Sequence, residues 1–259
     1  MISSEIQQQF GFKFGPSGAH VSRTMMLDEL TLLFASVPAT AGPDDYRQAI
    51  EQDNVLHKNT GKTRSLTCRH LIDLYGLDPQ QTLFRNLRRL WDVDPAAHPV
   101  LACQMALTRD PLLRLSQQKI LELPCGTVLP RIDMEQLIAE RYPERFSPRT
   151  LKSLAQNINA TWTHAGFLRG RSRKTRCEPD IRPVNVAFAL WLGYLQGATG
   201  HRLFATRWTK LLERRQEELL ALARQAGFSG LLTFKHASEI IEITFPDYLT
   251  EDEEALLHE

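Results

Sequence analysis

The chain has 259 residues and a nearly balanced charge, with 31 Lys and Arg against 30 Asp and Glu. Hydrophobic residues make up 42% of it and charged residues 24%, which is typical of folded globular proteins and excludes a disordered chain. The longest apolar stretch, VAFALWLGYL, is far shorter than the roughly 20 residues that cross a bilayer. The N-terminus has no signal-peptide pattern, so we expect a cytoplasmic protein that does not contact a membrane.

The first half of the sequence has the apolar periodicity of short helices. The predicted helices cover 42–56, 62–76, 78–94 and 98–121. Pro111 is expected to kink or divide the last of them, because proline cannot continue a helix. These segments predict a helical domain over residues 1–125. The sequence LPCGTVLPRID, with two prolines and a glycine, marks its boundary.

Residues 126–182 have the order of elements of a winged helix-turn-helix unit. A compact amphipathic helix over 131–142 precedes a second helix that begins after Ser147, a residue type favoured as an N-cap. Gly166 ends the second helix, and a short strand, a turn and a cationic loop or second strand follow. The predicted fold is therefore mainly α, with a helical N-terminal domain, winged helix-turn-helix-like units and short β-hairpins.

Two groups of side chains in this unit are candidate DNA contacts. A polar row along the second helix can bind phosphates or pair with base edges in the major groove. Its members are Arg149, Lys152, Ser153, Gln156 and Asn159. The wing places five cations in eight residues, and we expect them to bind backbone phosphates. These cations are Arg169, Arg171, Arg173, Lys174 and Arg176.

A second basic patch is predicted from Lys58, Lys62, Arg64 and Arg69. The NTGKTR sequence within it is not a P-loop, because Leu56 stands where that motif requires glycine. The four cysteines form no Cys-x-x-Cys pair and the histidines are scattered, so we expect neither a metal site nor a cofactor. No known catalytic motif is present, and we therefore do not expect an enzyme.

Residues 183–259 are predicted to form a helical extension. A helix over 205–228 and a β-hairpin over 231–245 carry mixed charges, which favour packing or partner binding over a second DNA-binding unit. The tail from Asp247 holds six acids and no Lys or Arg, so residues 1–246 carry 24 acids against 31 bases. Acidic tails of this kind are generally solvated, although they can also mask a basic surface.

Four segments resemble the BrxA family of BREX anti-phage defence systems. They are GPSGAHVSRTMMLDEL, DDYRQAIEQDNVLHKNTGKTRSLTCRHLIDLYGLD, HPVLACQMALTRDPLLRLSQQKIL and SPRTLKSLAQNINATWTHAGFL, and the likeness covers much of residues 15–182. The resemblance implies a mostly helical DNA-binding accessory protein without catalysis of its own. It also implies partners such as a methyltransferase, a phosphatase-like protein and large ATPases. The extension from Pro183 departs from the shorter members of the family.

The function expected from these features is non-catalytic binding of double-stranded DNA in such a defence system. Two alternatives stay open. One is a helical interaction scaffold in a multiprotein complex, in which the basic loop contacts an acidic protein surface. The other is a transcriptional regulator, which requires a preferred operator sequence.

Overall fold

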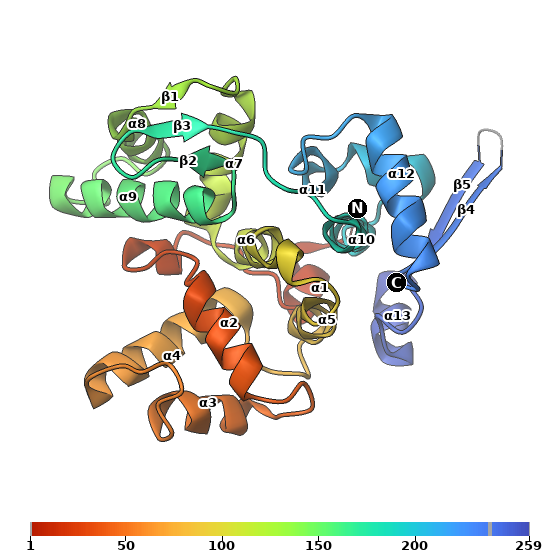
Figure 1. Cartoon of the computed structure of the whole chain (residues 1–259), viewed down its shortest axis with the longest axis horizontal. Helices are drawn as coiled ribbons and strands as arrows, with labels where there is room; N and C mark the ends of the chain where they lie inside the picture. The colour runs from red at the N-terminus through yellow and green to blue at the C-terminus, as the bar shows by residue number, and fades with distance from the viewer. Residues whose placement is uncertain (1, 238–239, 259) are drawn as a thin grey trace.

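The protein is mainly helical, as the sequence predicts (Figure 1). A computed structural model describes residues 2–237 and 240–258. Within these ranges the strands form one three-stranded and one two-stranded antiparallel sheet. Every helix in the described part is too short or too polar to cross a bilayer.

The N-terminal half is a bundle of short helices around leucine and aromatic side chains. Its elements are α1 (Ser4–Gln9), η1 (Ala19–Val21), α2 (Leu27–Ser36), α3 (Pro43–Glu51), α4 (Gly61–Tyr75), α5 (Thr82–Trp91), η2 (Pro95–Ala97), α6 (His98–Arg109) and α7 (Pro111–Glu122). Pro111 divides α6 from α7, which confirms the predicted break. Asp110 then caps α7, because its carboxylate accepts the N–H groups of Leu112 and Leu113. The central helix is α6, which contacts α2, α4, α5, α7, α9 and α10.

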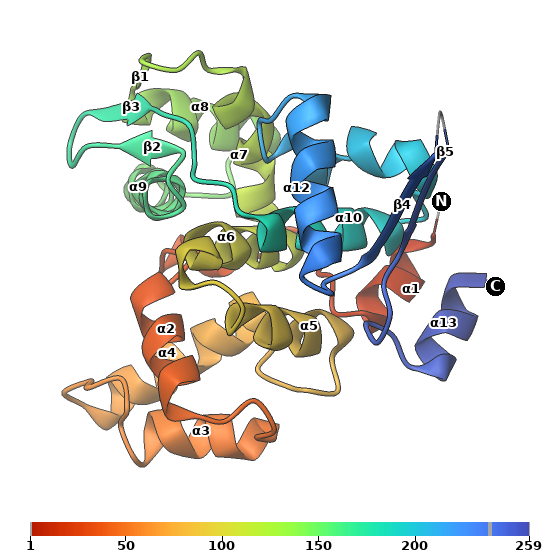
Figure 2. The same ribbon diagram turned by 45° about the vertical axis from the view of Figure 1, so that its right-hand side comes forward.

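The segment after α7 forms a unit of two helices and three strands. Its elements are β1 (Val128–Leu129), α8 (Arg131–Arg141), α9 (Pro148–His164), β2 (Leu168–Arg169) and β3 (Lys174–Arg176). The middle strand is β3, which is antiparallel to both neighbours, with Thr175 opposite Val128 and Arg176 opposite Leu168. Strand β2 contacts α9, and Figure 2 shows it next to this helix, which is seen there end-on.

The C-terminal segment adds a second small unit. Its elements are α10 (Pro183–Tyr194), η3 (Gly200–Ala205), α11 (Arg207–Lys210), α12 (Gln216–Phe228), β4 (Thr233–Ala237), β5 (Ile240–Thr244) and α13 (Glu251–His258). Pairing of β4 with β5 confirms the predicted hairpin, although its turn lies outside the described residues. The single helix predicted over 205–228 is wrong, because α11 ends at Lys210 and α12 begins only at Gln216.

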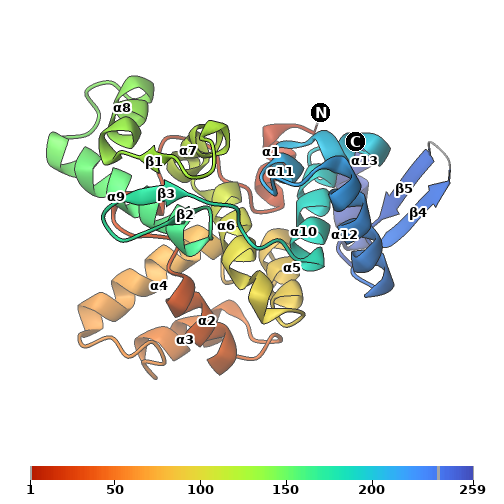
Figure 3. The ribbon, with the colours of Figure 1, turned by 45° about the horizontal axis from the view of Figure 1, so that its top comes forward.

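One hydrophobic core extends through all three segments. Residues 184–193 of α10 are all buried, and Figure 3 shows this helix between α12 and the pair α5 and α6. Buried amides join α10 to the bundle. The Nε2 atom of Gln104 donates to the Asn185 carbonyl at 3.0 Å, and Nδ2 of Asn185 donates to the Ala97 carbonyl at 3.1 Å. The C-terminal unit is therefore packed into the bundle rather than tethered to it.

The acidic tail folds back on α5. The Glu253 carboxylate pairs with Arg85 and also accepts a hydrogen bond from the Thr82 hydroxyl. The composition of the tail predicts that its acids are solvated, and for Glu253 this prediction is wrong. It does describe Glu251 and Asp252, which are exposed.

Tyr248 anchors the start of this tail in the core. Its ring is fully buried, and its hydroxyl donates to the Leu231 carbonyl at 2.7 Å. Its own carbonyl accepts a hydrogen bond from Nδ2 of Asn86 at 2.8 Å. The Arg89 guanidinium lies over the ring, 3.9 Å from the centroid. These contacts join the end of the chain to α5.

Two substitutions at Tyr248 distinguish the contribution of its hydroxyl to stability from the contribution of its ring. Tyr248→Phe should lower the free energy of unfolding by about 1 kcal/mol, because the Leu231 carbonyl loses its donor. Tyr248→Ala should lower it by about 3–5 kcal/mol, because a large buried ring is removed. Urea denaturation followed by circular dichroism measures both. Tyr142→Phe is the control, since Tyr142 is half-buried and its contacts with Arg141 and Arg145 are made by its ring, which phenylalanine keeps. If Tyr248→Phe and Tyr142→Phe lowered the free energy of unfolding equally, the stabilising role of the Tyr248 hydroxyl bond to Leu231 would be contradicted.

Candidate nucleic-acid interface

Helix α9 carries the first group of candidate contacts. The Ser147 hydroxyl caps it by accepting the Thr150 N–H at 3.2 Å, and Pro148 occupies its first position, as the sequence predicts. Its inner face, which includes Leu154, Ile158 and Trp162, is fully buried. Its outer face exposes Arg149, Lys152, Ser153 and Gln156. The helix is therefore amphipathic, and its polar side faces solvent.

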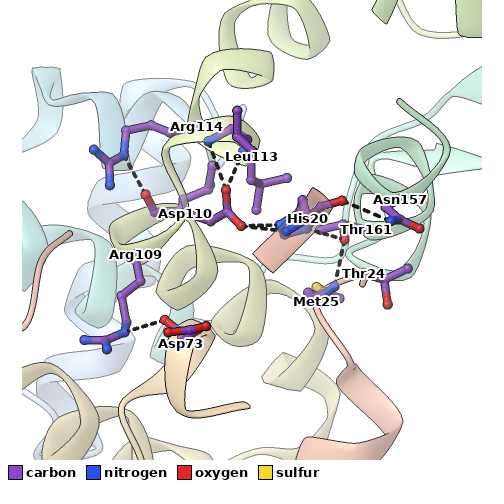
Figure 4. A network of polar contacts seen from close by, with 12 residues as sticks. His20, Thr24, Met25, Asp73, Arg109, Asp110, Leu113, Arg114, Asn157 and Thr161 are labelled. Carbon is purple, nitrogen blue, oxygen red and sulfur yellow. Dashed lines mark hydrogen bonds and ion pairs between the residues drawn. The ribbon is translucent and has the colours of Figure 1, made fainter. Parts of the chain in front are cut away.

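A buried polar network holds α9 against the rest of the fold (Figure 4). The Nδ1 atom of His20 lies 2.7 Å from Oδ2 of Asp110, and its Nε2 lies 2.8 Å from Oγ1 of Thr161. The Asn157 side chain donates to the His20 carbonyl at 2.9 Å, and the Met25 N–H donates to Oγ1 of Thr161 at 2.8 Å. Two residues of α9 are thus bonded to the segment around η1.

Asp110 is the hub of this network. One carboxylate oxygen caps α7, and the other accepts the His20 N–H at 3.0 Å while facing its ring. Burial alone raises the pKa of Asp110. The His20 charge and hydrogen bonds from His20 and Leu113 outweigh burial and hold this pKa below its ordinary value. A Cβ on Gly18 would lie 2.0 Å from the carboxylate, so this approach requires glycine there.

A hydroxyl, an imidazole and a carboxylate in this order also occur in hydrolytic triads. Here the side chains of His20 and Asp110 are 0% and 2% exposed, and Thr161 is fully buried. No substrate can reach the Thr161 hydroxyl without unfolding the site. The network therefore holds α9 in position within the fold. No sequence motif signalled it, because its members lie far apart in the chain.

The prediction that Asn159 faces a DNA groove is wrong. Asn159 is 3% exposed and lies on the inner side of α9 with Ala155 and Trp162. On a helix, residue 159 neighbours both Gln156, three residues before it, and Ala155, four residues before it. The burial shows that it belongs to the inner side, together with Ala155, Ile158 and Trp162. The exposed polar row therefore runs from Arg149 to Gln156.

The β2–β3 turn carries the second group of candidate contacts. Gly170 has a φ of +100°, and a Cβ there would lie 2.2 Å from the Arg173 carbonyl, so the turn requires glycine. Lys174 closes the turn by donating to the Gly170 carbonyl at 2.8 Å, and burial lowers its pKa. Arg169, Arg171 and Arg173 are exposed and form no ion pair with any described residue.

The prediction that Arg176 binds a phosphate is also wrong. Arg176 is 1% exposed, and its guanidinium forms an ion pair with Glu213. It also donates to the carbonyls of Ile120 at 2.9 Å and Phe167 at 3.0 Å. Its donors are therefore used inside the protein, where they tie the base of the hairpin to α7 and to the segment before α12.

The remaining candidates lie on neighbouring elements. Strand β2, which leads into the β2–β3 turn (residues 170–173), contacts α9, and the turn projects past this helix (Figure 2). The exposed polar side chains contributed by α9, by the last residue of β2 and by the turn are Arg149, Lys152, Ser153, Gln156, Arg169, Arg171 and Arg173. Five of these seven side chains are cations. We refer to this set as the helix–turn face.

The predicted second basic patch is divided by the fold. Lys58 is half-buried and pairs with Glu29 at 2.9 Å, and half-buried Arg64 donates to a backbone carbonyl. Lys62 and Arg69 are exposed and lie two turns apart on α4, hence on one side of that helix. Only these two residues of the patch present their charge to solvent without an ion pair in the described structure.

Comparison of the chain with protein-family models gives no match, and a search of curated proteins gives none either. The four cysteines are free thiols, of which Cys68 and Cys103 are buried. Within the described ranges, no group of three or more His, Cys, Asp or Glu side chains is placed to hold a metal ion.

Substitution of Asp110 should destabilise the protein by an amount that depends on pH. Asp110→Asn should lower the free energy of unfolding by about 3–5 kcal/mol near neutral pH, because it breaks a buried pair. The Asp110 pKa is lower in the folded state than the ordinary 3.8, so its carboxylate stabilises the fold above that value. This stabilisation is lost as the pH falls through the folded pKa.

Urea denaturation at several pH values between about 3 and 7 measures the stability gap between the wild type and Asp110→Asn. The difference in stability between the two proteins should be largest near pH 7 and should become smaller as the pH falls toward about 3. Asp53→Asn, which changes an exposed carboxylate, is the control and should alter stability little. A gap that does not depend on pH would contradict the role assigned to Asp110.

Proposed function

We propose that this chain is a cytoplasmic protein that binds double-stranded DNA without altering it, through a winged helix-turn-helix unit formed by residues 126–182. The observation that carries the proposal is the helix–turn face. It combines an exposed polar helix with an adjacent arginine-rich turn whose cations have no acidic partner among the described residues. Unpaired cations on neighbouring elements are suited to contact the closely spaced phosphates of a duplex.

The order of elements in this unit supports the proposal. Strand β1, helices α8 and α9, and the β2–β3 hairpin follow one another as in winged helix-turn-helix units. In such units the second helix enters the major groove and the hairpin lies against the neighbouring backbone. We assign these two roles to helix α9 and the β2–β3 turn. The buried network around His20 keeps α9 fixed, so its outer face needs no rearrangement to bind.

The chemistry of each side chain assigns its role. Ser153 and Gln156 are the uncharged hydrogen-bonding residues of the exposed row, and they are our candidates for contact with base edges. Arg149 and Lys152 lie at the start of α9, where they bind phosphates flanking the groove. The hairpin arginines bind the backbone alongside it.

Helix α4 extends the proposed footprint. The ribbon views place α4 on the same side of the molecule as α9 (Figures 1 and 3). Lys62 and Arg69 would then bind phosphates further along the same duplex. The charge of Arg69 is also felt by His70, whose pKa is lowered by burial and by the charges of Arg23 and Arg69.

The resemblance to the BrxA family assigns this DNA binding to an accessory role in a BREX-like anti-phage defence system. A methyltransferase, a phosphatase-like protein and large ATPases would then be encoded beside it. Inspection of the neighbouring genes tests this assignment independently of DNA binding.

A second candidate function is that of an interaction scaffold. It is favoured by two apolar side chains of the C-terminal unit, since Phe228 is 84% and Ile240 73% exposed. These residues lie outside the helix–turn face, so protein contact through them is compatible with DNA binding. A transcriptional regulator would differ from both by selecting one operator sequence from random duplexes.

Neutralising the turn tests the proposed phosphate contacts. A triple variant with Arg169→Gln, Arg171→Gln and Arg173→Gln should bind all duplex sequences more weakly. It should also reduce the slope of log affinity against log salt by about 2–3, because each lost phosphate contact removes about 0.9. Fluorescence anisotropy with a duplex of about 20 base pairs, at about 50–200 mM salt, measures both quantities.

The matched control removes the same charge elsewhere. It replaces three exposed arginines of the C-terminal segment by Gln, namely Arg202, Arg215 and Arg224. This variant should retain nearly all of the wild-type affinity and salt slope. Equal losses in the two triple variants would mean that net charge, and not the turn, determines binding.

Substitution in the helix row should have a different effect. Gln156→Ala should relax the sequence preference at one base pair by about 1–3 kcal/mol and leave the salt slope unchanged, because a base-edge contact carries sequence information and no charge. Selection from random duplexes, followed by competition between the best sequence and its single-base variants, measures this preference. Identical selected sequences from the wild type and Gln156→Ala would remove Gln156 from the base-reading role.

A further inference from the structure

A cavity between α7 and α11 combines three cations with apolar walls. Its volume is about 660 Å³, and none of its lining residues belongs to α9 or to the β2–β3 turn. Arg114, Arg207 and Lys210 contribute the cations, and Leu115 and Leu121 contribute apolar surface. None of these three cations forms an ion pair with a described residue.

The Arg114 guanidinium is fixed in place. Its Nε donates to the Leu107 carbonyl at 2.7 Å, and its Nη2 donates to the carbonyls of Thr108 and Lys13, each at 2.7 Å. Two of these carbonyls belong to the last turn of α6. The Nη1 atom carries no hydrogen bond to any described residue. Arg114 lines the cavity, and because these bonds hold its side chain in place, it would lose little conformational freedom on binding a ligand.

Arg207 is held by a reciprocal contact with Gln117. Its Nη2 donates to Oε1 of Gln117 at 2.8 Å, and Nε2 of Gln117 donates to the Arg207 carbonyl at 3.0 Å. Its guanidinium also lies over the Trp208 ring, 5.2 Å from the centroid. Lys210 follows at the end of α11 and is exposed. Two of the three cations are therefore positioned before any ligand arrives.

The positive charges of Arg114 and Arg207 repel each other. Burial, with a contribution from the charge of Arg207, lowers the pKa of Arg114 to about 10. Arg207 is partly exposed, yet burial of its guanidinium lowers its pKa as well. Like charges in a partly desolvated wall repel one another, and an anion between them relieves this repulsion.

The acids that line the same cavity are already engaged. The Glu213 carboxylate is paired with Arg176, which lies behind it at the base of the β2–β3 hairpin. The Glu122 carboxylate accepts a hydrogen bond from Nε2 of Gln118 at 2.7 Å. Neither acid forms an ion pair with the three lining cations. Because Gln118 is neutral, Glu122 keeps its negative charge, so three cations share the wall with one uncompensated carboxylate.

We propose that this cavity binds a phosphoryl group, with Arg114, Arg207 and Lys210 as its ligands. Guanidinium groups match the oxygen geometry of phosphates and bind them through charge-assisted hydrogen bonds. Leu115 and Leu121 provide a surface for an apolar group joined to the phosphate, so a phosphomonoester with an organic group binds more tightly than inorganic phosphate. The phosphoryl group comes either from a free small molecule or from DNA.

Calorimetric titration with phenyl phosphate at low salt tests the site. The wild type should bind at one site and more tightly than it binds inorganic phosphate. Arg207→Gln and Lys210→Gln should each weaken binding by about tenfold or more, as expected for loss of a charge-assisted hydrogen bond. Lys210→Gln is the decisive variant, because Lys210 makes no contact that the fold requires.

Arg171→Gln is the matched control and should bind phenyl phosphate like the wild type, because its charge lies on the β2–β3 turn. Absence of phenyl phosphate binding at millimolar concentration would overturn the proposal. Unchanged affinity in Lys210→Gln and Arg207→Gln would overturn it as well. Circular dichroism confirms that each variant is folded.

A short duplex identifies the source of the phosphate. If the source is DNA, the duplex competes with phenyl phosphate, and Lys210→Gln weakens both ligands together. If the source is a free small molecule, the duplex does not compete and Lys210→Gln weakens phenyl phosphate alone. The triple variant of the turn keeps the two proposals separate, because it should lose DNA binding and retain phenyl phosphate binding.

Discussion

The buried hydrogen bonds of His20 are the contact on which the arrangement of this fold depends. Its ring contacts Asp110, the N-cap of α7, which is 90 residues away in the chain, and Thr161 of α9, which is 141 residues away. A buried imidazole is stable only if both ring nitrogens have partners, and Asp110 and Thr161 supply them. Because Asp110 also caps α7, one small network sets the position of α9 relative to the bundle. The exposed side of α9 is therefore presented on a rigid support.

Arginine serves two different purposes in this protein. Arg176, Arg109 and Arg114 are buried or half-buried and donate to backbone carbonyls, so they act as internal connectors between segments. The arginines of the β2–β3 turn donate to no carbonyl of the residues that the structure describes. The formal charge of +1 hides this division, since it counts connectors and solvent-facing cations alike. What distinguishes a surface suited to polyanions is which cations lack an internal partner.

Local chemistry made much of the fold predictable. Capping by Ser147, the break at Pro111 and the termination at Gly166 depend on residues adjacent in sequence, and they are found where the pattern indicates. The errors arise where distant residues decide. Arg176 lies within a cationic run, but its position on β3 turns it toward Glu213, 37 residues away. Strand β1 is only two residues long and exists because it pairs with β3. The polar pattern of α9 could not reveal that Asn159 faces inward.

The contacts of the C-terminal segment with α5 affect how the protein unfolds. Tyr248 and Glu253 contact α5, while α10 packs on both α5 and α6, so the C-terminal segment is bonded to the first half at two separate places. Loss of either attachment uncovers apolar surface of the helical bundle itself. Denaturation should therefore be a single cooperative event involving the whole polypeptide, and a fragment that stops before Pro183 would leave the core of α6 exposed to water.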